Sequence, residues 1–136
     1  MTVGIEIKMP ILTELDVVIA RQRARKEAQQ MGFRSAKVYR LATAVSELAF
    51  NLRFHALRGG TIRILSVKDR DRVGIEIVAE DEGPGIPDIE LAMQDGYSTN
   101  NGLGGGLPGT RRLMDEFSIE SAVGVGTRVV ARMWRS

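Results

Sequence analysis

The sequence predicts an α+β fold in which a mixed, largely antiparallel sheet is covered on one face by helices, as a two-layer sandwich. Several segments alternate between apolar and polar residues, as strands do when one face of their sheet is buried. Two long segments instead carry apolar residues at a spacing of three or four, as amphipathic helices do. The chain has 136 residues, which fits one domain over residues 1–136.

The first predicted strand and helix are separated by a proline and a helix cap. Residues 3–9 alternate and predict a strand that ends at Pro10. Thr13 followed by Asp16 resembles a capping box in which Asp replaces the usual Glu. A helix should follow this cap and stop at Gly32, because glycine commonly ends a helix.

A second helix and a β-hairpin should come next. Ser35 is expected to cap a helix over residues 36–57, which Gly59 and Gly60 close. The charged residues 68–72 predict a turn between two alternating segments. The two hairpin strands are expected over residues 61–67 and 73–80.

The C-terminal third should combine short elements with one long loop. Pro87 predicts the start of a short helix that ends near Gln94. Residues 95–108 carry few apolar side chains and predict a loop, which at this length is usually functional or mobile. The remaining elements are expected to be a helix over residues 109–116 and two strands over residues 117–121 and 127–134.

Composition narrows the functional classes. The net charge is only +2, which does not favour a nucleic-acid partner. The chain contains no cysteine, which excludes disulfides, thiolate metal sites and thiol catalysis. No apolar run approaches membrane-spanning length, and the N-terminus lacks the apolar core of a signal peptide. We therefore expect a cytoplasmic protein without a membrane partner.

Glu47, Asn51 and His55 are spaced four residues apart and should form one polar stripe on the second helix. The neutral amide of Asn51 suits one position around Mg²⁺, while phosphates and waters fill the others. Glu47, one turn away, suits a general base for an attacking hydroxyl. The alternative is a solvated helix face, and the single histidine, His55, more often packs or caps near a helix end than performs catalysis.

Asp81 follows an alternating segment and precedes two closely spaced glycines. A carboxylate only accepts hydrogen bonds, so Asp81 suits the exocyclic amine of adenine and would reject guanine, which has an oxygen there. Gly83 and Gly85 would let the chain turn beneath the base. Thr127, at the start of the last strand, has a hydroxyl that could reach the same ring. The structural alternatives are an ordinary Asp-Glu-Gly turn and a β-branched residue at a strand start.

A second glycine cluster contains Gly102, Gly104, Gly106 and Gly109. Its spacing formally matches a dinucleotide-binding fingerprint, but the preceding residues do not form the buried strand which that motif requires. The lysine of a Walker A loop is missing as well. The cluster therefore predicts a glycine-rich lid that leads into a helix N-terminus, where backbone amides can bind phosphate.

These motifs, in this order, resemble the N, G1 and G2 boxes of the GHKL ATPase and kinase superfamily, which has the Bergerat fold. The resemblance covers the whole chain. The free-standing members of this superfamily are serine/threonine-protein kinases that regulate sigma factors, and they include the switch kinases of the stressosome. The boxes read Glu47-x-x-x-Asn51-x-x-x-His55-Ala56, Asp81-x-Gly83-x-Gly85 and Gly102-x-Gly104-x-Gly106, followed by Gly126-Thr127.

The resemblance implies an ATP- and Mg²⁺-dependent kinase that phosphorylates STAS-domain scaffold or antagonist proteins in a partner-switching stress pathway. Once released, it would activate a downstream phosphatase or other effector. It also implies that Glu47 is the catalytic base or its positioner and that Asn51 is the Mg²⁺ ligand. The other implied nucleotide-binding residues are Asp81, Gly83, Gly85, Gly102, Gly104, Gly106 and Thr127.

Two other functions stay open. One is a nucleotide-dependent sequestering factor of the anti-sigma type, and the other is an isolated GHKL ATPase or histidine-kinase catalytic module. Intact Glu47 and Asn51 argue against an inactive pseudokinase. The only histidine, His55, lies inside the N box, so no phosphoacceptor histidine is evident for a histidine kinase.

Overall fold

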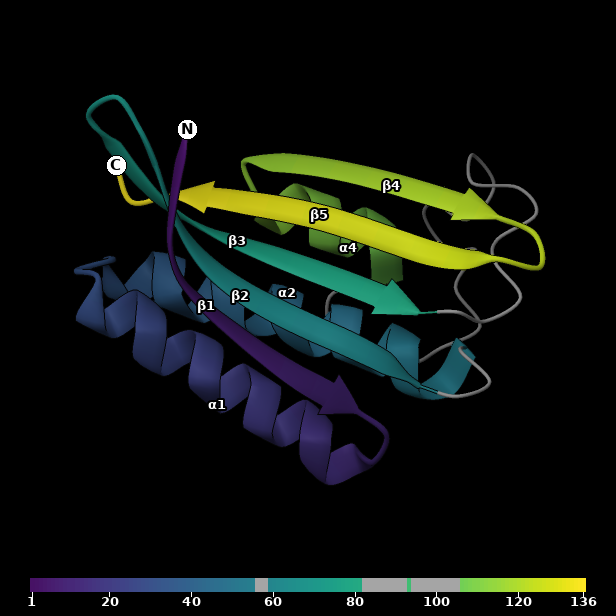
Figure 1. Cartoon of the computed structure of the whole chain (residues 1–136). Coiled ribbons are helices and arrows are strands. Elements are labelled where there is room, and N and C mark those ends of the chain that lie inside the picture. Colours follow the sequence, from purple (N-terminus) through teal and green to yellow (C-terminus); the bar gives the residue numbers. More distant parts are fainter. Residues whose placement is uncertain (56–58, 82–92, 94–105) are drawn as a thin grey trace.

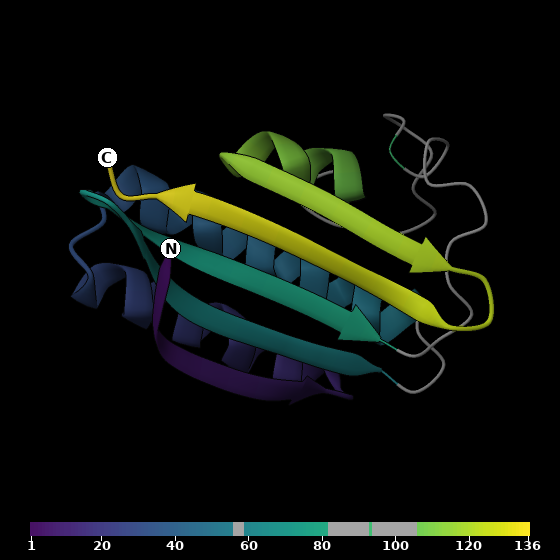
Figure 2. The same ribbon diagram turned by 45° about the horizontal axis from the view of Figure 1, so that its top comes forward.

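The computed structural model describes residues 1–55, 59–81, 93 and 106–136. It shows a five-stranded sheet with the helices packed on one face, so the expected two-layer α+β sandwich is confirmed (Figures 1 and 2). The strand order is β1-β2-β3-β5-β4, and every neighbouring pair is antiparallel. The elements are β1 (Thr2–Ile11), α1 (Glu14–Gln30), α2 (Ser35–His55), β2 (Gly60–Asp69), β3 (Arg72–Asp81), α4 (Gly106–Leu113), β4 (Glu116–Ala122) and β5 (Gly126–Trp134).

The core lies between the sheet and the helices. Alternate strand residues such as Ile64, Ile77 and Ala131 are buried against the helix layer, as the period of two requires. Helix α1 contributes a stripe of small residues, including Ala20 and Ala24, which allows it to approach α2 closely. Helix α2 lies centrally, because it contacts α1, α4 and strands β1 to β3.

The predicted capping box of α1 is confirmed in both halves. Thr13 Oγ1 accepts a hydrogen bond from the backbone amide of Asp16, at 3.3 Å. Asp16 Oδ2 accepts bonds from the amides of Leu12, at 2.9 Å, and Thr13, at 3.0 Å. These amide donors hold the pKa of the Asp16 carboxyl below its usual value. The helix ends before Gly32, whose φ of 86° favours glycine.

Three predicted boundaries in the segment from β1 to the hairpin turn are wrong. β1 continues through Pro10 to Ile11, because β1 is an edge strand and needs no amide donor on its outer side. Ser35 is the first residue of α2 rather than its cap. The hairpin turn is shorter than residues 68–72, because Arg70 adopts a left-handed φ of 58° and allows pairing up to Asp69 and Arg72.

The start of α4 also differs from the prediction. The helix begins at Gly106 instead of Gly109, because Pro108 is tolerated within a first helical turn. It ends at Leu113, since the amide of Asp115 donates to the carbonyl of Arg132 and so begins the pairing of β4 with β5. Residues 106–108 are thus helical, and the rest of the predicted 95–108 loop lies outside the described residues, as does the predicted helix from Pro87 except for residue 93.

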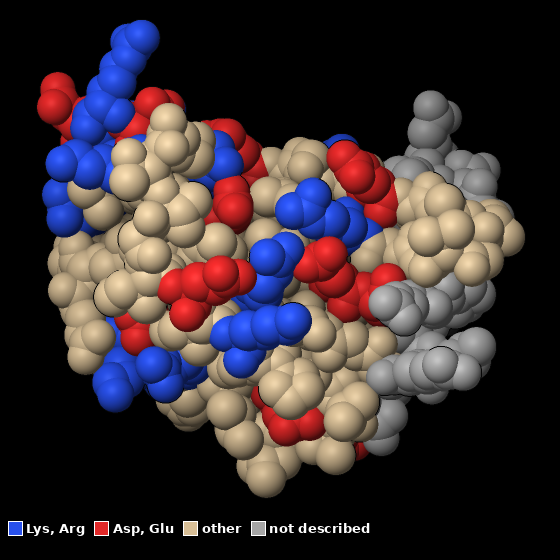
Figure 3. All heavy atoms as spheres, viewed as in Figure 1, with Lys and Arg blue, Asp and Glu red and all other residues tan. Residues whose placement is uncertain are grey.

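The other face of the sheet carries intermixed basic and acidic side chains (Figure 3). Arg63 bridges Glu80, at 2.6 Å, and Glu6, at 3.3 Å, across three neighbouring strands. Arg132 similarly joins Glu76 and Glu116, although Arg132 Nε is buried without a hydrogen-bond partner among the described residues. These ion pairs are partly buried, and they balance the charges of this face of the sheet.

Candidate functional site

Three polar residues, Asp81, Thr127 and Ser121, form a row across the sheet at the end where β3 finishes and β5 begins. Asp81, the last residue of β3, lies directly opposite Thr127 of β5. Thr127 in turn lies directly opposite Ser121 of β4. Asp81 is two residues from the buried Ala79, so its side chain shares the face that carries the helices. Directly opposed residues share a face, and the whole row therefore faces the helix layer.

Gly60 of β2 ties this row to helix α2. A β-carbon on Gly60 would lie 2.3 Å from the carbonyl oxygen of Glu80 and 3.2 Å from Cβ of Asp81. It would also lie 2.7 Å from Cδ2 of Leu52, the residue after Asn51 in α2. The bare backbone at Gly60 thus brings α2 and the end of β3 together. The Gly59-Gly60 pair was expected only to close the second helix, although two adjacent glycines also suit a close approach of backbone.

Helix α2 places Glu47 and Asn51 on its interior side, at the end of the helix nearest this row. Glu47 is only 1% exposed. Asn51 is half-buried, and its Nδ2 atom is buried without a hydrogen-bond partner among the described residues. The alternative interpretation of this stripe as a solvated face is therefore wrong for both residues. Residue 55 is the last of α2, and its side chain lies outside the described residues.

The amide of Asn51 fits the predicted magnesium role. A buried amide group without a partner is unfavourable in a finished fold, so its presence marks a place where a further polar group is needed. Rotation about χ2 exchanges the amide nitrogen and oxygen, which lets the oxygen take that position. Within the described part of the chain, no three His, Cys, Asp or Glu side chains are grouped to hold a metal. A single neutral oxygen suits Mg²⁺ that keeps phosphate oxygens and waters as its other ligands.

Helix α4 packs against α2. Gly106 is its first residue, and Thr110, one turn later, is fully buried. The guanidinium of Arg40 in α2 donates to the carbonyl of Leu113 at 3.1 Å, which fixes the C-terminal end of α4 against α2. The other predicted loop glycines, Gly83, Gly85, Gly102 and Gly104, lie outside the described residues.

Family comparison agrees with this geometry. The sequence model of one protein family, the histidine kinase-like ATPase domain, matches residues 11–133. The chain belongs to this family. The range runs from the last residue of β1 almost to the end of β5, and it includes Glu47, Asn51 and the row at the end of the sheet.

Curated relatives narrow the activity. The chain is 52% identical over 124 residues to the serine/threonine-protein kinase RsbT of Bacillus subtilis. The aligned region covers 91% of this chain and 92% of RsbT. It is 37% identical over 94 residues to the anti-sigma F factor of Thermoanaerobacter sp. strain X514, covering 65% of this chain and 64% of that factor. The predictions of a serine/threonine-protein kinase and of a partner-switching family are confirmed by this similarity.

Solved structures support the fold. The structure of the RsbU and RsbW domains of a Mycobacterium tuberculosis protein matches with a TM-score of 0.66 at 16% identity, covering 98% of this chain and 34% of that one. A mycobacterial sensor histidine kinase, MprB, matches with a TM-score of 0.56 at 15% identity, covering 96% and 97%. None of the helices in the described residues is long and apolar enough to cross a membrane.

Proposed function

We propose that this kinase transfers the terminal phosphoryl group of ATP to a serine or threonine of a STAS-domain protein in a cytoplasmic partner-switching pathway. When released from that scaffold, it binds and activates a downstream phosphatase or other effector. The catalytic part is supported by the buried, unpartnered amide nitrogen of Asn51, in the part of α2 that lies against Gly60 beside Asp81. The pathway assignment is supported by the 52% identity to RsbT.

In this proposal the row at the end of the sheet recognises adenine. Asp81 accepts a hydrogen bond from the exocyclic amine, and Thr127 provides a second polar group beside it. Gly83 and Gly85 shape the loop that passes beneath the base. Because Asp81 is fixed by strand pairing with Thr127, the acceptor is positioned before the nucleotide arrives.

The phosphates and the metal would lie between α2 and α4. Asn51 would hold Mg²⁺ through its amide oxygen, while backbone amides at Gly102, Gly104 and Gly106 would cover the phosphates. Bound Mg²⁺ neutralises negative charge on the phosphates during transfer. Glu47, one helical turn from Asn51, accepts the proton of the attacking serine or threonine hydroxyl, or orients that hydroxyl.

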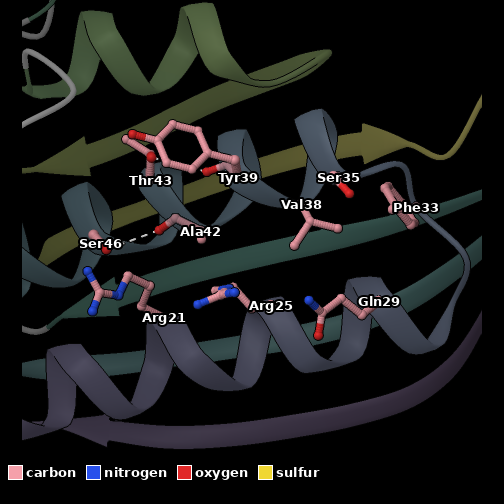
Figure 4. Close-up of a pocket in the computed structure, with 10 residues that line it drawn as sticks. All are labelled: Arg21, Arg25, Gln29, Phe33, Ser35, Val38, Tyr39, Ala42, Thr43 and Ser46. Atoms are coloured by element: carbon pink, nitrogen blue, oxygen red, sulfur yellow. Dashed lines mark hydrogen bonds between the residues drawn. The ribbon is translucent and has the colours of Figure 1, made fainter.

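The protein substrate is proposed to dock in a groove between α1 and α2 (Figure 4). The groove has a volume of about 520 Å³, and the side chains of Arg21, Arg25 and Gln29 point from α1 toward α2. Neither arginine has an ion-pair partner in the part of the chain that the structure describes. No acidic residue is among the described residues that line the groove. Charge complementarity therefore favours an acidic segment of the STAS-domain partner.

Ser46 connects this groove to the catalytic residues. Its hydroxyl lines the groove and donates to the carbonyl of Ala42 at 3.0 Å, so it is held within α2. The next residue is Glu47, which points into the core. A partner in the groove thus contacts the same helical turn that carries the proposed base.

The test of the function is phosphoryl transfer to a STAS-domain protein encoded near this gene. Labelled ATP, Mg²⁺ and the two proteins are incubated together, and label on serine or threonine of the partner is the expected result. If the two proteins bind each other in a nucleotide-dependent way without transfer, the chain is a sequestering factor of the anti-sigma type instead.

The docking groove is tested separately by charge reversal. Arg21→Glu combined with Arg25→Glu should weaken binding of the partner and slow its phosphorylation, with ATP affinity unchanged. Lys26→Glu is the matched control, because Lys26 is an exposed residue of α1 outside the groove. Equal loss in the control and the double variant would show a general charge effect and remove the groove from the proposal.

A further inference from the structure

The hydroxyl groups of Ser121 and Thr127 form a hydrogen bond whose direction can be worked out. The two oxygens are 2.8 Å apart, and either could donate. Ser121 Oγ also lies 3.1 Å from the carbonyl oxygen of Gly126. A carbonyl only accepts, so Ser121 is the donor in its contact with Gly126. With the proton of Ser121 in that bond, the proton shared by the two hydroxyls is that of Thr127.

The turn between β4 and β5 builds this arrangement into the backbone. Ala122 pairs with Gly126, and the amide of Val125 donates to the carbonyl of Ala122 at 3.0 Å. Gly124 and Gly126 have φ values of 82° and 140°, which favour glycine. The carbonyl of Gly126 is therefore held within reach of Ser121 by the turn itself.

The direction of this hydrogen bond decides whether Thr127 can donate to a nucleotide base or only accept from it. Thr127 has given its proton to Ser121, so its oxygen can only accept a further hydrogen bond. Asp81, directly across the strand pair, is also an acceptor when ionised. Asp81 and Thr127 then both act as acceptors, and this pair favours a base edge, or a bridging water, that donates to both.

We propose that Ser121 is a positioning residue for base recognition, which holds the Thr127 hydroxyl as an acceptor and so strengthens selection of 6-amino over 6-oxo purine nucleotides. This inference rests on the proposed ATP site. It adds a residue that does not touch the nucleotide and acts through Thr127. Without Ser121, the Thr127 hydroxyl could rotate and donate to a 6-oxo group.

The test compares the affinities of the full chain for ATP and for inosine triphosphate, which has a 6-oxo base. Ser121→Ala should lower the ratio of ATP to inosine triphosphate affinity about three- to tenfold, since one oriented neutral hydrogen bond is lost. Ser121→Thr, which keeps the hydroxyl and suits a strand, should restore the ratio. Ser118→Ala is the matched control, because Ser118 lies on the same strand and is exposed.

A double-variant cycle separates positioning from a structural effect. If Ser121 acts through Thr127, Ser121→Ala should change the ratio in the wild-type background but not in Thr127→Val. An unchanged ratio in Ser121→Ala, or equal weakening of both nucleotides, would overturn the inference while leaving the ATP site intact. A wild-type chain that binds the two nucleotides equally would instead refute the base recognition proposed for Asp81.

Discussion

Leu52 Cδ2 of α2 lies only 2.7 Å from the place that a β-carbon on Gly60 would occupy. This contact joins the helix that carries Glu47 and Asn51 to the strand that supports Asp81. The site is therefore assembled across a backbone-to-side-chain contact, and its geometry should depend on the absence of a side chain at residue 60.

Gly60→Ala should destabilise the fold and weaken ATP binding together. The added carbon would meet the carbonyl oxygen of Glu80 at 2.3 Å, and a strand carbonyl cannot move without disturbing its pairing. Overpacking of this kind costs about 1–3 kcal/mol of unfolding free energy. Urea unfolding and calorimetric titration with ATP would measure the two effects.

Gly4→Ala is the matched control for that variant. Its β-carbon would lie 2.5 Å from Oγ of Ser66, a side-chain atom that can rotate away, in the half of β2 far from the site. We expect a smaller loss of stability and unchanged ATP affinity. If Gly60→Ala bound ATP as tightly as the wild type, the close contact at residue 60 would not be part of the site.

Asp81→Asn should abolish adenine recognition while the fold is kept. The amide can place a donor against the donor amine of the base, which leaves a mismatched polar pair. Glu80→Gln is the matched control, because Glu80 lies on the opposite face of β3 and pairs with Arg63. Calorimetry should show lost ATP binding only in the Asp81 variant, with similar thermal melting of both proteins. Wild-type affinity in Asp81→Asn would remove this residue from the site.

Much of the fold was predictable because the local signals agreed with one another. The capping box of Thr13 and Asp16, the stop at Gly32 and the alternation of the strands each depend on interactions within a few residues. The hairpin turn was predicted too long, because a run of five charged residues resembles a loop. Nothing in that run shows that Arg70 takes a left-handed φ and shortens the turn to two residues.

The site was predictable in its residue types but not in its connections. The spacing of Glu47 and Asn51 placed them on one helix face, but only the packing of the sandwich shows that this face is buried. The relation of Asp81 to Thr127 and Ser121 depends on the strand order β3-β5-β4, which joins residues far apart in the chain. For the same reason, Ser121 carried no recognisable signal of its own, and the glycine pair at residues 59 and 60 did not show which elements Gly60 brings together.

Asn51→Ala should reduce phosphoryl transfer more than ATP binding. The amide is expected to help most in the transition state, where phosphate charge is redistributed and a lost metal ligand is felt most strongly. Single-turnover transfer to the protein partner and equilibrium ATP binding should be measured at several Mg²⁺ concentrations. Asn51→Asp should retain more activity than Asn51→Ala, since a carboxylate keeps an oxygen ligand. Equal losses in binding and transfer would argue for a role in nucleotide binding alone.

Glu47→Gln should leave ATP binding nearly intact and slow transfer by about 10²- to 10⁴-fold, the usual contribution of a general base. The amide matches the carboxylate in size, so the buried position is not emptied. Quenched-flow measurement of partner phosphorylation, with ATP binding measured in parallel, would separate the two steps. Transfer at the wild-type rate would show that Glu47 is not the base.

The capping box of α1 should make stability depend on pH in a specific direction. The amides of Leu12 and Thr13 lower the pKa of Asp16 in the folded chain, so the cap stabilises the protein above the usual aspartate pKa of about 4. The stabilisation is lost as the pH falls through the lowered folded pKa. Asp16→Ala should therefore be less stable than the wild type at pH 7, and the difference should shrink below about pH 4. Glu14→Ala, in the same first turn, is the control, and urea unfolding from pH 7 to pH 3 is the measurement. A difference between Asp16→Ala and the wild type that stays constant over this range would contradict the assignment of a charged cap.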